Sequence, residues 1–94
     1  MYRHIVFWRF KEGTEQEAAA FVAALNGLVG VIPQIRSARA ALNTNPANGL
    51  CGALISDFDT KEDMEAYKAD PRHQAVSAMC KAIRLSREAV DFEL

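Results

Sequence analysis

The first apolar segment of the chain, YRHIVFWRFK at residues 2–11, is hydrophobic on two sides, and this feature most constrains the fold. Its aromatic and β-branched residues predict a β-strand. Because side chains alternate along a strand, Val6 and Trp8 lie on one face, and Ile5 and Phe7 lie on the other. A sheet with one face open to water would not need apolar residues on both faces. The sequence therefore predicts that something covers the second face.

The next segment predicts one amphipathic helix over residues 14–29. Its apolar residues recur at helical spacing on one face, namely Phe21, Val22, Leu25, Leu28 and Val29. Thr14 and Glu17 have the spacing of a capping box, in which each side chain satisfies a free backbone N–H of the first turn. Gly30 and Pro33 predict the stop.

Three further segments predict strands. Residues 35–43 carry alanines and arginines that would also suit a helix, but the segment is short and precedes the loop sequence NTNPANG. Residues 50–59 place Leu54 and Phe58 on one face. Residues 87–94 alternate along their length, with Val90, Phe92 and Leu94 on one side and Asp91 and Glu93 on the other.

Residues 60–85 predict a helical region that is broken in the middle. Thr60 is placed to cap the first helix. Asp70 is placed to cap the second, with Pro71 at its first position, where a missing N–H costs nothing. The second helix carries an inward stripe at helical spacing, made of His73, Val76, Met79, Cys80 and Ile83.

The order strand, helix, strand, strand, broken helix, strand predicts an α+β protein with a ferredoxin-like βαββαβ sandwich. Its 94 residues suit one domain, residues 1–94. Both helical layers would cover one face of the sheet. A second copy of the chain would explain the apolar residues on the other face. Two four-stranded sheets facing each other would close a dimeric α/β barrel and remove exposed edges.

Composition excludes several functional classes. The chain has 11 lysines and arginines against 12 acidic residues, which argues against a nucleic-acid partner. No segment approaches the roughly 20 apolar residues that span a bilayer, and the N-terminal segment is interrupted by charges, so we expect a cytoplasmic protein without a membrane partner. Cys51 and Cys80 are predicted to be buried free thiols. Phosphate loops, nucleophile elbows and metal-ligand clusters are absent from the sequence, so we expect no cofactor and no metal.

Three segments carry a resemblance to a known family. RHIVFWRFKEGT, IPQIRS and AYKADPRHQAV occur in the order and with the spacing of the stress-responsive α/β-barrel family, or Dabb domain. The chain resembles this family over almost its whole length. The resemblance implies a ferredoxin-like protomer that pairs into a dimeric α/β barrel, which agrees with the two-faced first strand. It implies no single activity.

A plant branch of this family contains polyketide cyclases, such as olivetolic acid cyclase, which close a linear chain by an aldol step without a cofactor. In that branch a tyrosine and a histidine six residues later are catalytic, and the resemblance carries these roles to Tyr67 and His73. The chain departs from the family at Gly52 and from the cyclase branch at Asp70, where histidines are found. The pocket positions implied by the resemblance are His4, Val6, Trp8, Phe21, Val22 and Leu25.

The residues themselves permit an acid–base unit. His73 lies in the first turn of its helix on the inward stripe, where the helix dipole and partial burial disfavour a second proton, so its ring is predicted to be neutral near pH 7. The break at Asp70–Pro71 would aim Tyr67 and His73 at one cavity. The phenol would steady the imidazole or donate a hydrogen bond to a substrate carbonyl. The structural alternative leaves the Tyr67 hydroxyl in water and His73 bonded to the backbone. His4 is then a structural residue that bonds to the opposite loop or the final strand.

We expect a small-molecule-binding dimeric barrel. Its ligand would be a small apolar carbonyl compound, held in an apolar pocket between sheet and helices that Leu54 and Met79 also line. One alternative is a cofactor-independent cyclase, lyase or isomerase that acts on an enolisable carbonyl, with His73 as the base. The other alternative is a structural dimer scaffold.

Overall fold

The computed structural model describes residues 1–94, apart from the side chain of Pro46. Within these residues the chain has four strands, three α-helices and one short 3-10 helix. In chain order they are β1 (Tyr2–Phe10), α1 (Glu15–Asn26), β2 (Ser37–Leu42), η1 (Pro46–Asn48), β3 (Gly52–Phe58), α2 (Lys61–Ala69), α3 (Pro71–Ile83) and β4 (Arg84–Glu93).

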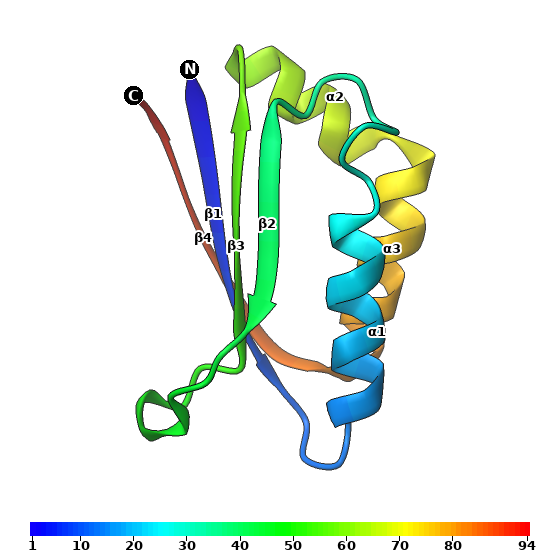
Figure 1. Cartoon of the computed structure of the whole chain (residues 1–94), viewed down its shortest axis with the longest axis vertical. Helices are drawn as coiled ribbons and strands as arrows, with labels where there is room; N and C mark the ends of the chain where they lie inside the picture. The colour runs from blue at the N-terminus through cyan, green and yellow to red at the C-terminus, as the bar shows by residue number, and fades with distance from the viewer.

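The strands form one antiparallel sheet in the order β2-β3-β1-β4. β1 is central, and its His4 lies opposite Ser56 of β3 on one side and Asp91 of β4 on the other. Figure 1 shows the helices on one side of the sheet, the other side uncovered, and both termini at the same end. The predicted ferredoxin-like βαββαβ architecture is confirmed.

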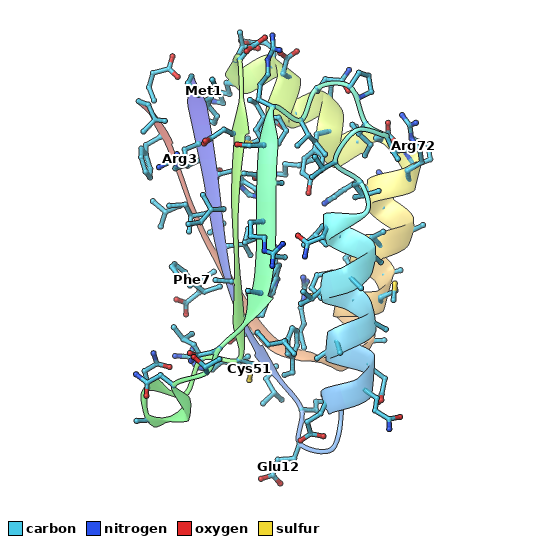
Figure 2. All side chains as sticks on the ribbon, viewed as in Figure 1. Met1, Arg3, Phe7, Glu12, Cys51 and Arg72 are labelled. Carbon is cyan, nitrogen blue, oxygen red and sulfur yellow. The ribbon has the colours of Figure 1, made fainter. Side chains whose placement is uncertain are left out.

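The break between α2 and α3 follows the predicted caps. The Thr60 hydroxyl accepts the Asp63 N–H at 3.1 Å, and the Asp70 carboxylate accepts the Arg72 N–H at 2.8 Å. Asp70 also binds the Arg72 guanidinium, which reaches on to the carbonyl of Val31. Arg72 therefore joins this turn, where Figure 2 labels it, to the segment after α1.

The predicted bounds and capping box of the first helix are wrong. α1 ends at Asn26, because the chain turns at Gly27 and continues through short turns. Thr14 makes no side-chain cap, since its hydroxyl donates to the Lys11 carbonyl at 2.6 Å and so serves the preceding turn. Gly30 lies beyond the helix with a φ of +84°, a conformation that glycine adopts without strain.

The core lies between the sheet and the helices. Val6, Trp8 and Phe10 of β1 point into it, as the alternation predicted. Trp8 meets Phe21 of α1 edge to face, with ring centroids 5.0 Å apart, a preferred aromatic geometry. This packing fixes α1 against the middle of the sheet.

The opposite face of the sheet is uncovered and carries apolar side chains at its centre. Ile55 of β3 is 48% exposed and Val90 of β4 is 54% exposed. In Figure 2 the side chain of Phe7 points away from the helices. β1 therefore carries apolar residues on both faces, as predicted, but this chain covers only one of them.

Two smaller predictions have mixed outcomes. Both cysteines are free, but only Cys80 is buried, whereas Cys51 is half-buried where its Sγ accepts the N–H of Phe10 at 3.3 Å. No helix within the described residues is long and apolar enough to cross a membrane. The cytoplasmic location stays a prediction.

Candidate functional site

A cavity of about 540 Å³ opens between the sheet and the helices. Its floor is apolar and consists of Val6 and Trp8 on β1, Leu54 on β3, and Phe21 and Leu25 on α1. The rest of the lining comes from His4, α2, α3 and β4, and the polar side chains in it beyond His4 are Lys68, His73, Gln74, Ser77, Lys81, Arg84 and Arg87. This size and this mixture of an apolar floor with a few polar groups are typical of small-molecule sites.

His4 lies at the base of the cavity and is only 2% exposed. Its Nδ1 is hydrogen-bonded to Asp91, its neighbour across the β1–β4 pair. Burial is the largest influence on the pKa of His4 and lowers it, and the pKa stays below its ordinary value although the Asp91 carboxylate raises it. The ring is therefore neutral at pH 7, and a ring that donates Nδ1–H to Asp91 keeps Nε2 as a proton acceptor. The predicted bond of His4 to the final strand is confirmed.

His73 lies in the first turn of α3 and lines the cavity wall. Its Nδ1 donates to the Lys68 carbonyl over 3.4 Å, which leaves Nε2 as the acceptor. Burial is the largest cause that lowers the pKa of His73, and the positive charges of Arg87 and Lys68 act in the same direction. The prediction that this imidazole is neutral agrees with these causes.

Tyr67 supports His73 and is not part of the cavity lining. The tyrosine is 2% exposed, and its ring packs between Phe58, at 5.1 Å, and His73, at 4.2 Å between centroids. Burial raises the pKa of Tyr67 to about 12, so the phenol keeps its proton at neutral pH. The break after α2 thus brings tyrosine and histidine together, but only the histidine lines the cavity. Of the two roles considered for the phenol, this position favours steadying the imidazole.

Most of the predicted lining residues lie where the sequence placed them. His4, Val6, Trp8, Phe21, Leu25 and Leu54 line the cavity. Val22 does not, because it turns toward the edge of the core. Met79 is also a correction, since it is 37% exposed on the outer side of α3. The inward stripe of α3 passes through His73, Ser77 and Cys80. Met79 precedes Cys80 by one residue, which turns its side chain by about 100° around the helix axis and away from the cavity.

A family model described as the stress responsive A/B barrel domain matches residues 2–94. The chain belongs to this family. No curated protein matches the sequence.

Two solved structures are similar to this Dabb chain in both sequence and fold. A dimeric ferredoxin-like protein of unknown function from Bacteroides fragilis is 28% identical, with a TM-score of 0.86 over 99% of this chain and 95% of that chain. One from Thermobifida fusca is 27% identical, with a TM-score of 0.87 over 99% and 90%. The hydroxynitrile lyase of Passiflora edulis is 18% identical, with a TM-score of 0.85 over 99% and 92%, and shares the fold.

Sequence reasoning missed half of this Dabb cavity. On α3, Ser77 and Lys81 continue the stripe of His73 at steps of four, so helical spacing could have found them. On β4, Arg87 and Asp91 lie on the helix-facing side, opposite Trp8 and His4. The polar side of the last strand therefore faces the cavity, and its apolar side faces outward. No local signal distinguishes these two orientations.

The arrangement offers two neutral imidazoles at the edge of an apolar space. The Cys80 thiol also lines the cavity, but burial raises its pKa, so it is a poor nucleophile at neutral pH. Within the part of the chain that the structure describes, no three potential ligands come together as a metal site. Proton transfer through His4 and His73 is the chemistry that these side chains support.

Proposed function

We propose that the protein binds a small organic molecule in the cavity between the sheet and α3. The observation that carries this proposal is the apolar floor of Val6, Trp8 and Leu54 beside two neutral histidines, in a volume of about 540 Å³. Apolar floors supply affinity by burial, and a few fixed polar groups orient the ligand.

We also propose that the binding unit is a homodimer. The uncovered face of the sheet exposes apolar side chains from two strands, namely Ile55 of β3 and Val90 and Phe92 of β4. A surface of this kind marks an interaction site. The relatives from Bacteroides fragilis and Thermobifida fusca are dimeric, and two such sheets packed face to face would form the barrel.

Trp8 provides the test of ligand binding, because it is the only tryptophan of the chain and lines the cavity. We expect octan-1-ol to change Trp8 fluorescence saturably. Ser77→Phe, at the cavity wall, should abolish the change by filling the space. Ala78→Phe is the matched control, since Ala78 is exposed on the same helix outside the lining, and it should leave the titration unchanged. An unsaturable signal, or one unaffected by Ser77→Phe, would favour the structural dimer scaffold.

A second candidate function is proton abstraction beside a carbonyl, and the two neutral imidazoles favour it. In this step Nε2 of His73 takes the proton from the carbon next to a ketone, and the electron pair of the C–H bond moves into the enolate. His4, whose Nδ1 is held by Asp91, is placed as the second base. When the protonated histidine returns a proton to the carbon, the ketone and the neutral imidazole are both restored, so the step needs no oxidant or cofactor.

Deuterium exchange tests this second function. We expect the protein in D₂O to accelerate α-deuteration of 2-tetralone above the buffer rate, as followed by NMR. Loss of a general base should slow the catalysed part by about 100-fold, so His73→Gln should return the rate almost to that of buffer. Exchange at the buffer rate with the unmodified protein would reject catalysis and leave ligand binding intact.

A further inference from the structure

The charges around the cavity are one-sided. Its lining contains Lys68, Lys81, Arg84 and Arg87 and no aspartate or glutamate. The whole chain has 11 basic and 12 acidic residues, so this cavity concentrates one sign of charge in an otherwise balanced protein. A cleft lined by one sign of charge over low-dielectric walls attracts the opposite charge.

None of these four cations forms an ion pair with an acidic side chain among the residues that the structure describes. Among the described residues, Arg3, Arg36 and Arg72 each form an ion pair with an aspartate, and Arg9 lies near Glu88. Asp91 lies opposite His4 on β4, outside the lining, and its carboxylate is bonded to the neutral His4 ring. The lining therefore carries an excess of positive charge.

The cations come from three segments that meet around one space. Lys68 lies in the last turn of α2, Lys81 and Arg84 lie at the end of α3 and the start of β4, and Arg87 faces inward from β4 opposite Trp8. This convergence depends on the strand register and on the break before α3.

The charge of Arg87 reaches the interior of the cavity. Burial is the largest cause of the pKa shifts at His4, Tyr67, His73 and Cys80, and at each of these groups Arg87 favours the deprotonated form. A negative group in the cavity would meet the same field with the opposite sign.

We propose that the ligand of this cavity is an amphipathic organic anion. Its apolar body would lie on Val6, Trp8 and Leu54, and its anionic head group would lie between Lys68 and Arg87. This inference rests on the proposed ligand site and adds the charge of the ligand to it. A neutral head group would leave this excess of positive charge without a counter-charge, and a cationic head group would be repelled by it.

Three probes with similar alkyl bodies test the inference, namely octanoate, octan-1-ol and octylamine. Titration against Trp8 fluorescence at low salt should give the tightest binding for octanoate and the weakest for octylamine. Added salt should weaken octanoate binding and leave octan-1-ol binding almost unchanged, because ions screen only the charged head group.

Variants locate the effect. Arg87→Gln and Lys68→Gln should each weaken octanoate binding by about fivefold, the size expected for a partly exposed ion pair, and weaken octan-1-ol binding by much less. Lys61→Gln is the matched control, since Lys61 lies on α2, is exposed and is not part of the cavity lining. It should change neither titration. Circular dichroism would verify that each variant is folded.

The outcomes separate this inference from the proposed function. If octanoate and octan-1-ol bind equally, and Arg87→Gln affects neither, the anionic ligand is wrong while the ligand site remains. If Lys61→Gln weakens octanoate as much as Lys68→Gln does, the attraction belongs to the whole surface and the inference also fails. If none of the three probes binds, both proposals fail.

Discussion

His4 and His73 are the two histidines of the chain, and removal from water lowers the pKa of each, although His4 is buried and His73 only half-buried. Each ring also has its Nδ1 occupied, by the Asp91 carboxylate and by the Lys68 carbonyl. The sequence predicted the neutral state of His73 from its place in the first turn of a helix. It missed Asp91 as the partner that holds His4 in the cavity, because that pairing depends on the register of strands far apart in the chain.

Two histidines with lowered pKa values make the stability of the protein dependent on pH. Unfolding exposes both rings to water, where they take up protons below a pH of about 6.5. Their folded pKa values are lower, so the folded state binds fewer protons there and acid favours unfolding. We expect the free energy of unfolding in urea to fall between about pH 7.5 and about pH 5.

His73→Gln should flatten this dependence, because glutamine removes one titrating group. The salt-bridged Asp57, Asp59 and Asp70 have lowered pKa values and lose their contribution only at more acidic pH, outside this window. An equal or steeper slope in His73→Gln would contradict the assignment of a lowered pKa to His73.

Two variants of Tyr67 distinguish the packing role of its ring from a chemical role of its hydroxyl. Tyr67→Phe keeps the ring between Phe58 and His73, so we expect octan-1-ol binding to be unchanged and stability to fall by less than about 1 kcal/mol. Tyr67→Ala removes the ring and should lower the free energy of unfolding by about 3–5 kcal/mol. Urea unfolding measures the loss of stability in both variants, and the rate of 2-tetralone exchange shows whether the hydroxyl takes part in catalysis. A loss of exchange in Tyr67→Phe would mean that the hydroxyl acts on the substrate.

Among the elements, the break between α2 and α3 sets the position of His73. Asp70 caps α3 and binds Arg72, and these contacts hold the pKa of Asp70 down at about 2. Asp70→Ala should lower the Tm by about 5 °C through loss of the cap, whereas Asp70→Asn keeps a capping oxygen and should lower it less. Thermal unfolding at neutral pH gives the Tm of both variants. Equal losses in both variants would assign the effect to the Arg72 ion pair and not to the cap.

Local sequence signals predicted some elements better than others. Thr60, Asp70 and Pro71 predicted the break because caps act within one turn. The same reasoning was wrong at Thr14, whose hydroxyl donates to the carbonyl of Lys11. The alternation of β4 was readable, but the sequence could not tell that Arg87 faces the cavity, since strand pairing with β1 decides that.

In the whole molecule, the uncovered sheet face predicts how the chain assembles. Ile55→Glu places a charge at an exposed apolar position of β3 and should convert a dimer to a monomer at micromolar concentration, as measured by analytical ultracentrifugation. Met79→Glu is the matched control, because Met79 is also apolar and exposed but lies on α3 on the other side of the sheet. A dimer that survives Ile55→Glu and dissociates with Met79→Glu would place the interface on the helices.

The ligand site itself is tested most directly by intermolecular nuclear Overhauser effects between octan-1-ol and the protein. The proposed site predicts contacts from the alkyl protons to the Trp8 indole and the His73 ring, which both line the cavity. Contacts confined to the uncovered face, at Ile55 and Val90, or no contacts at saturating octan-1-ol, would contradict a small-molecule site between the sheet and α3.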